Sequence, residues 1–71
     1  MSLNGHKNWN HWNVSLWIAN DEMLYRLALD CMRDNGLDEA ARQFLKAVGR
    51  KTPDGAPYSK TSVIAAMRGL R

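Results

Sequence analysis

The chain has 71 residues, of which 45% are hydrophobic and 24% charged, and its net charge is +3. A chain of this length forms one domain, expected to span residues 1–71 with residues 1–8 flexible, and its core gives only marginal stability. The single cysteine, Cys31, excludes an internal disulfide and a cysteine-based zinc site. No apolar run approaches the roughly 18 residues of a membrane span, and the polar start differs from a secretory signal. We therefore expect a cytoplasmic protein with no membrane partner.

The first expected element covers residues 10–19, and two periodicities compete there. Val14, Leu16 and Ile18 recur at every second position, which is typical of a strand, whereas Trp12 and Leu16 share one face of a helix. A lone strand would have no partner in an otherwise helical chain. We therefore predict a short helix, with the strand as the alternative.

The second element is a helix expected over residues 21–34. Asn20 would cap its start, and Asn35-Gly36 would end it in the left-handed conformation. Its apolar stripe consists of Leu24, Leu27, Ala28 and Cys31.

Two further helices are expected in the second half of the chain. One would begin with Asp38 as its cap and end at Gly49, and the other would begin after Ser59 as its cap. The loop between them, residues 50–57, contains a Pro-Asp-Gly turn. The chain is thus predicted to be an all-α bundle of about four short helices. A homodimer is expected, because a second subunit is the simplest supplement to so small a core.

The three tryptophans allow two interpretations. They could stack on nucleic-acid bases with Lys7, His6 and His11 nearby, or they could be buried in the core or in a dimer interface. We favour burial, since three tryptophans would supply much of the core of so small a domain. The predicted core or dimer-interface residues are Trp9, Trp12, Leu16, Trp17, Ile18, Leu24, Leu27, Phe44, Val63 and Met67.

Charge is distributed unevenly. Residues 1–36 hold three basic and four acidic residues, a net charge of −1, whereas residues 37–71 hold seven basic and three acidic residues, a net charge of +4. A basic half indicates an acidic partner, nucleic acid included, although an ordinary solvated face gives the same pattern. The residues that could bind nucleic acid or another anion are Arg42, Lys46, Arg50, Lys51, Ser59, Lys60, Arg68 and Arg71.

The start of the last helix is the most specific of these anion candidates. A cation in the first turn opposes the helix dipole, so Lys60 beside the Ser59 cap indicates a bound anion such as phosphate. The alternative is an ordinary serine cap with an exposed lysine. A helix-turn-helix is disfavoured, because the third helix begins with Asp38 and Glu39, which would meet phosphates.

Catalytic and metal chemistry find little support in the sequence. His6, His11 and Cys31 lack the spacing of metal ligands, and Cys31 lies on an apolar stripe where a small buried residue is the default. We therefore expect no metal, no cofactor and no enzymatic activity.

Two motifs carry a resemblance to a known family. The stretch NWNHWNVSLWIANDEMLYRLAL, residues 8–29, resembles the opening of a family of short, uncharacterised proteins encoded by phages, prophages and plasmids. The T-P-D-G turn at residues 52–55 matches a second motif of that family, but the chain beyond it is basic where the family is acidic. The matched positions of the first motif are Trp9, Trp12, Asn13, Val14, Leu16, Trp17, Ile18, Asn20, Asp21, Glu22, Leu24 and Tyr25.

This resemblance implies a phage or mobile-element origin and a cytoplasmic setting, and it implies no activity. We therefore predict a dimeric, non-catalytic protein–protein interaction module that acts on an unidentified host or phage protein. The alternative is a small basic nucleic-acid-binding protein that uses the C-terminal helix and the loop before it.

Overall fold

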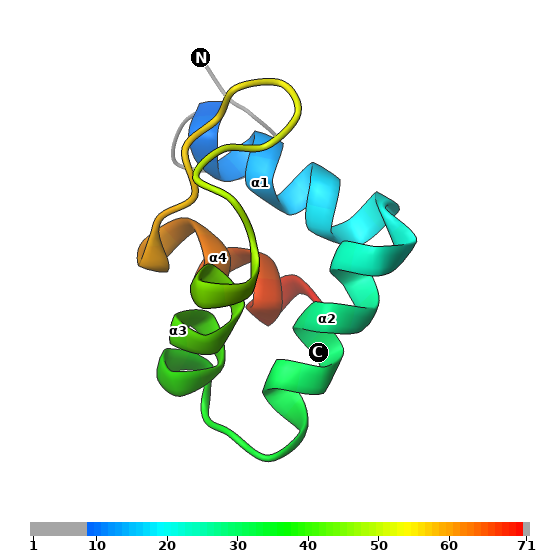
Figure 1. The fold of residues 1–71 in the computed structure, drawn as a ribbon, viewed down its shortest axis with the longest axis vertical. Coiled ribbons are helices and arrows are strands. Elements are labelled where there is room, and N and C mark those ends of the chain that lie inside the picture. Colours follow the sequence, from blue (N-terminus) through cyan, green and yellow to red (C-terminus); the bar gives the residue numbers. More distant parts are fainter. Residues whose placement is uncertain (1–8, 71) are drawn as a thin grey trace.

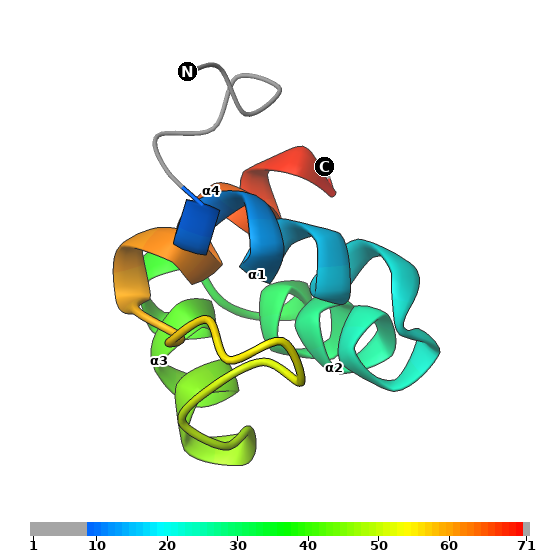
Figure 2. The same ribbon diagram turned by 90° about the horizontal axis from the view of Figure 1, so that it is seen from above.

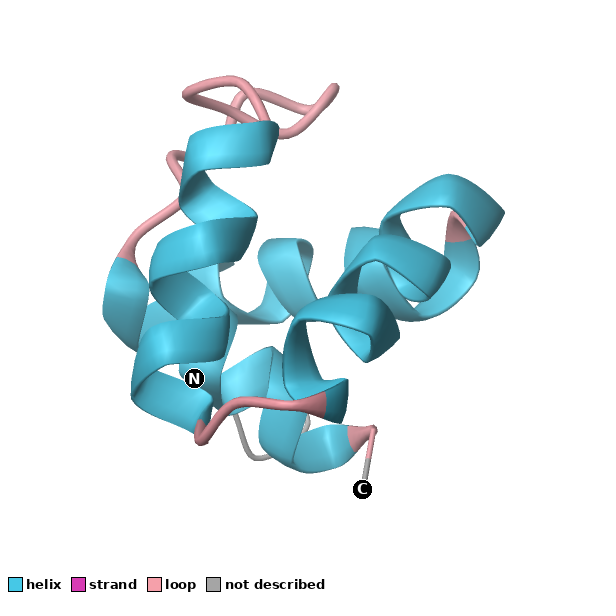
Figure 3. Ribbon diagram, turned by 60° about the horizontal axis from the view of Figure 1, so that its bottom comes forward, coloured by secondary structure: helices cyan, strands magenta, loops and turns pink. Residues whose placement is uncertain are grey.

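The computed structural model describes residues 9–70, which form four helices with short connections between the first three and a long loop before the last (Figure 1). The helices are α1 (Trp9–Asn20), α2 (Glu22–Arg33), α3 (Leu37–Ala47) and α4 (Lys60–Gly69). This part of the chain contains helices and loops and no strand (Figure 3), which confirms the predicted all-α class and the helical reading of residues 10–19. The expectation that residues 1–8 are flexible lies outside the described residues.

Each helix packs against two neighbours, so the four close into a ring (Figure 2). α1 and α3 each pack against both α2 and α4, whereas α2 and α4 meet only marginally. The radius of gyration is 10.9 Å, close to the roughly 11 Å expected of a compact chain of this length. The ring leaves one shared interior for the apolar faces of all four helices.

The core inside this ring consists of small and medium side chains around a single large one. Phe44 from α3 is the largest fully buried side chain, followed by Ile18 from α1 and Met67 from α4. Val63 is also fully buried, and Leu24 and Leu27 are partly buried against the same cluster. The remaining buried members of the cluster are Val14, Ala28, Cys31, Ala40, Ala41 and Ala66.

The tryptophans lie outside this interior. Trp9 is 45% exposed, and Trp12 and Trp17 are half-buried. Leu16 is 38% exposed, because α1 turns Val14 inward and carries apolar residues on more than one face. The core of the monomer therefore forms without these four predicted residues, and their burial against a second copy stays a prediction.

The joint between α1 and α2 differs in detail from the predicted one. Asp21, and not Asn20, caps α2, because Asp21 Oδ1 accepts a hydrogen bond from the Leu24 N–H at 3.0 Å. Asn20 remains in α1 and donates its amide to the Leu16 carbonyl at 2.9 Å. The predicted cap was wrong by one residue, since either side chain has the right chemistry.

The joint between α2 and α3 also corrects a prediction. Gly36 has φ −67° and serves as the N-cap of α3, so it does not end α2 in the left-handed conformation. Consequently α3 begins at Leu37, one residue before the predicted cap Asp38. Among the described glycines, the left-handed region is occupied only by Gly55, at φ 92°.

Candidate interaction surfaces

The loop between α3 and α4 is fastened to α1 by side-chain hydrogen bonds. Asn13 Oδ1 accepts from Thr52 Oγ1 at 2.6 Å, and Asn13 Nδ2 donates to Asp54 Oδ2 at 2.9 Å. Trp17 Nε1 donates to the same carboxylate oxygen at 3.0 Å. Asn13 is only 1% exposed and Thr52 only 4%, so the joint is a buried polar contact whose groups find partners.

Hydrogen bonds within the loop hold its shape. The Thr52 N–H donates to the Ala56 carbonyl at 2.8 Å, and the Gly55 N–H donates to the Thr52 carbonyl at 2.8 Å. Thr52 Oγ1 also accepts from the Ala56 N–H at 3.1 Å. Gly55 supplies the positive φ that this turn needs, which a side chain would disfavour. The loop is therefore a fixed part of the fold.

The same contacts set the ionisation of Asp54 and connect two sequence motifs that lie far apart in the chain. Two hydrogen bonds stabilise the ionised carboxylate of Asp54 and lower its pKa. The one from Asn13 has the larger effect, and the one from Trp17 has the smaller effect. The W-N-V-x-L-W segment and the T-P-D-G turn thus contact each other through these hydrogen bonds. Reasoning from the sequence missed it, although an asparagine inside an apolar block was a signal of a buried polar contact.

A first groove, of about 290 Å³, runs between α1 and α4. Trp12 and Leu16 line it from α1, Ala65 lines it from α4, and Leu70 lines it from the C-cap of α4. None of the nine described residues that line it carries a charge. Trp9, which is 45% exposed, lies one turn before Trp12 on the same side of α1. We call this surface the α1–α4 groove.

A second groove, of about 580 Å³, lies between α2, the end of α3 and the loop. Leu27 and Met23 line it from α2, and Met23 is 81% exposed. Pro53 and Lys51 line it from the loop, and Asp21 lies at the start of α2. We call this surface the α2–loop groove.

Tyr58 forms part of the wall of the α2–loop groove and is held from two sides. Its ring packs edge-on against Phe44, with centroids 6.0 Å apart and planes at 74°, and its N–H donates to the Arg50 carbonyl at 2.9 Å. Burial raises the pKa of Tyr58, and the negative charge of Asp21 raises it further by a smaller amount. The phenol therefore stays protonated, and the groove wall is neutral at this point.

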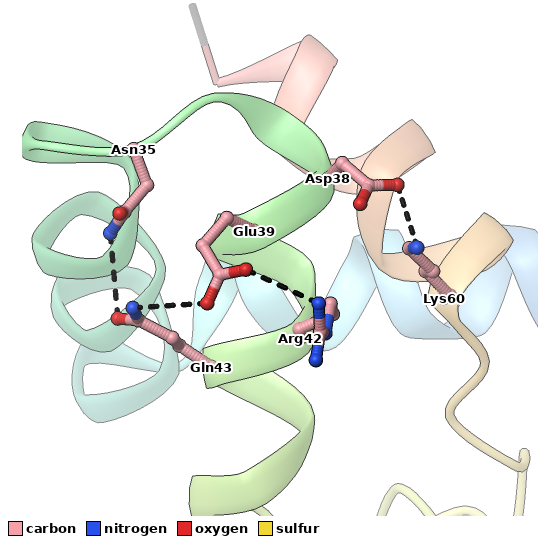
Figure 4. A network of polar contacts seen from close by, with 6 residues as sticks. All are labelled: Asn35, Asp38, Glu39, Arg42, Gln43 and Lys60. Atoms are coloured by element: carbon pink, nitrogen blue, oxygen red, sulfur yellow. Dashed lines mark hydrogen bonds and ion pairs between the residues drawn. The ribbon is translucent and has the colours of Figure 1, made fainter.

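Two of the predicted basic candidates are engaged within the protein (Figure 4). Lys60 Nζ, at the start of α4, lies 2.7 Å from Asp38 Oδ1 at the start of α3. Arg42 Nη1 lies 3.5 Å from Glu39 Oε1 on the same helix. Both pairs are largely exposed and contribute at most about 1 kcal/mol each. The cation in the first turn of α4 thus has a carboxylate partner from α3.

The predicted anion site at the start of α4 uses its hydroxyls internally. Ser59 Oγ accepts from the Ser62 N–H at 3.1 Å, and Ser62 Oγ accepts from the Ser59 N–H at 3.0 Å. This reciprocal arrangement is a capping box, which confirms Ser59 as the N-cap. The cap explains both serines without a bound anion.

Four of the other basic candidates have no carboxylate within 4.0 Å among the described residues. Lys46, Arg50 and Lys51 lie close together in the chain, at the end of α3 and the start of the loop. Arg68 lies apart from them, in the last turn of α4. Arg71 lies outside the described residues. Three of these four unpaired cations therefore lie within residues 46–51, and one of them, Lys51, lines the α2–loop groove.

The structure gives Cys31 a packing role in the core. Burial, with a smaller effect from Asp30, raises the pKa of the thiol, so the thiolate is disfavoured. Within residues 9–70, no group of three or more His, Cys, Asp or Glu side chains is placed to hold a metal ion. In the same range, none of the helices is long and apolar enough to cross a bilayer.

Comparison with known proteins identifies the family of the chain. The model of a family of unknown function (DUF7249) matches residues 1–70, so the chain belongs to that family. No curated protein and no solved structure matches it. Membership brings no activity with it, so a function has to be argued from the surfaces described above.

Proposed function

We propose that this member of the family of unknown function is a non-catalytic protein-interaction module that pairs with a second copy of itself through the α1–α4 groove. It would serve a phage or another mobile element as an accessory protein, which the resemblance to phage-encoded sequences supports. The observation that carries the proposal is an uncharged groove beside two exposed apolar side chains, Trp9 and Leu16.

Self-pairing is favoured by the absence of charge on this surface. A twofold dimer brings the same patch of both copies together, so a patch that carried a net charge would be repelled by the same charge on the other copy. α1 contains no Asp, Glu, Lys or Arg, and the described lining of the groove adds none. Bulky Trp12 and Leu16 also lie beside small Ala65 and Gly69, so each copy offers both protruding side chains and space for them.

A dimer of this kind would use a large share of the molecular surface. A standard interface buries about 800 Å² on each partner, roughly a sixth of the 4663 Å² accessible surface of this protein. Tryptophan is enriched at such interfaces because it buries a large apolar area. A second copy would also supplement a core in which Phe44 is the only fully buried aromatic residue described.

A small nucleic-acid-binding protein remains the alternative. Lys46, Arg50 and Lys51 support it, since they are basic, exposed and unpaired among the described residues. Lys60 and Arg42 support it less than their sequence positions indicated, because each has a carboxylate partner. Binding through these residues would weaken steeply with added salt, as phosphate contacts do.

Light scattering coupled to gel filtration tests self-pairing. The monomer has a mass of 8.1 kDa, so the wild type should approach twice that mass as its concentration rises from about 1 to 200 μM. Leu16→Glu should remain a monomer, because a carboxylate would be desolvated in the interface. Gly69→Glu tests the opposite wall, where an added Cβ meets no atom within 4 Å.

Met23→Glu is the matched control, because it makes the same change at an exposed apolar residue outside the α1–α4 groove. It should dimerise like the wild type, and circular dichroism should show that all three variants are folded. A wild type that stays at 8.1 kDa over the whole concentration range would overturn self-pairing. Equal loss of the dimer in Met23→Glu would place the interface elsewhere.

A further inference from the structure

We infer that the α2–loop groove binds a segment of a partner protein in which apolar side chains are flanked by aspartate or glutamate. This surface is separate from the α1–α4 groove, and the two lining sets share no residue. The protein would thereby have one surface for its own copy and another for a different chain.

The apolar part of the inference rests on the side chains that the groove exposes. Met23 is 81% exposed at its rim, and Leu27 and Val48 lie along it only partly buried. Methionine is flexible and polarisable, so it adapts to apolar side chains of different shapes. A groove of about 580 Å³ with such a lining has room for several apolar side chains of one segment.

The acidic part of the inference rests on charge. Lys51 lines the groove, and Lys46 and Arg50 flank the residues that form its wall at the end of α3. None of the three has a carboxylate within 4.0 Å among the described residues, whereas Lys60 and Arg42 do. Asp21 is the only acidic residue in the described lining. Lys46, Arg50 and Lys51 against Asp21 and Asp54 leave a net charge of +1 in and around the lining, which complements carboxylates at the ends of an apolar segment.

The walls of the groove are preformed, so binding needs little reorganisation. The loop that carries Lys51 is fixed to α1 through Thr52 and Asp54. Tyr58 is fixed by its edge-on contact with Phe44. A partner segment therefore loses its own flexibility on binding without also having to order this loop.

Protein is a better match than nucleic acid for this surface. A phosphate backbone would contact the three cations and leave Met23 and Leu27 without a role. Stacking of bases would need an accessible aromatic face, and Tyr58 is partly buried with its ring against Phe44. An apolar segment with flanking carboxylates uses both the cations and the apolar lining.

The test is an NMR titration of the ¹⁵N-labelled protein with three probes. The first is a synthetic amphipathic peptide of about three helical turns, with leucines on one face and glutamates at the flanks. The second has lysines in place of the glutamates, and the third is a short oligo-dT single strand. The glutamate peptide should shift the amide signals of Met23, Leu27, Val48 and Lys51, and it should bind about tenfold tighter than the lysine peptide.

Two charge-reversal variants separate the groove from general electrostatics. Lys51→Glu should abolish the preference for the glutamate peptide, because it replaces the only basic residue of the described lining with an acidic one. Arg68→Glu makes the same charge change in the last turn of α4, outside the described lining, and should leave peptide affinity within about twofold of the wild type. Both positions are exposed, so neither variant should unfold the protein.

Each of the other outcomes overturns the inference. Absent shifts, or shifts away from the groove, would show that it does not bind such a segment, and equal affinity for the lysine peptide would refute the role of charge. Tighter binding of oligo-dT, weakened equally by Lys51→Glu and Arg68→Glu, would assign the surface to nucleic acid. Repeating the titration with Leu16→Glu keeps this test independent of self-pairing, because that substitution changes the α1–α4 groove and leaves the lining of the α2–loop groove unaltered.

Discussion

Removal of the Asn13 side chain should destabilise the fold more than its small size indicates. In Asn13→Ala, the Thr52 hydroxyl loses the acceptor that it contacts at 2.6 Å, in a site where Thr52 is only 4% exposed. An unsatisfied buried polar group costs about 1–3 kcal/mol. The second lost bond, to the exposed Asp54, adds little because water can solvate the carboxylate. We expect a loss of about 2 kcal/mol, a large part of the roughly 3–5 kcal/mol available to so small a domain.

Thermal unfolding followed by circular dichroism measures this loss. A change of about 2 kcal/mol corresponds to a decrease in Tm of roughly 8–16 °C for a domain of this size. Asn20→Ala is the matched control, because Asn20 is exposed on the same helix and its amide hydrogen-bonds only the Leu16 carbonyl among the described residues. It should change stability by less than about 0.5 kcal/mol.

A double-mutant cycle tests the reasoning itself. Thr52→Val removes the hydroxyl from the other side of the same contact, so the combined variant should lose clearly less than the sum of the two single changes. A Tm for Asn13→Ala equal to that of Asn20→Ala would refute the buried joint. Full additivity of the Asn13 and Thr52 changes would refute the direct bond between them.

Two further predictions concern titrating groups. The pKa of Asp54 is lowered in the fold, so its contribution to stability is present above its ordinary pKa of about 3.9 and is lost as the pH falls through the folded value. Asp54→Asn should therefore be less stable than the wild type in urea at neutral pH, and the gap should close in acid; a constant gap would contradict this. Burial and the raised pKa should make Cys31 react slowly with a maleimide near neutral pH and fast in urea, and equal rates would contradict its buried position.

The regular helices were predictable because their signals are local. The apolar stripe of α2 and the polar residues at its ends predicted a helix over residues 21–34, and the structure has Glu22–Arg33. The Ser59 cap was likewise predictable, since Ser62 stands at the position that completes its capping box. Both features depend only on residues within one or two turns of each other.

The orientation of α1 was not predictable from its own residues. It carries apolar side chains on several faces, so the sequence could not show that Val14 would point inward and Leu16 outward. Ranking residues by size favoured burial of the tryptophans, whereas the ring of helices encloses a space filled by smaller side chains around Phe44. The packing partners of α1, and not its composition, decide which face is buried.

Contacts distant in the sequence account for the remaining differences. Asn13 and Thr52 are 39 positions apart, and the sequence around either residue does not indicate that the two will form a hydrogen bond. Lys60 was interpreted as an anion ligand because a cation in the first turn opposes the helix dipole, but Asp38 approaches it from the start of α3. Charges and polar groups of this kind can be assigned only once the helices are placed relative to one another.

Pairing through the α1–α4 groove is tested most directly by isotope-filtered NMR on an equimolar mixture of labelled and unlabelled protein. Only contacts between two copies give a signal in that experiment. Self-pairing predicts signals that link the Trp12 indole and the Leu16 methyls of one copy to Ala65 and Leu70 of the other. Signals confined to another face, or none at a concentration near 200 μM, would contradict it.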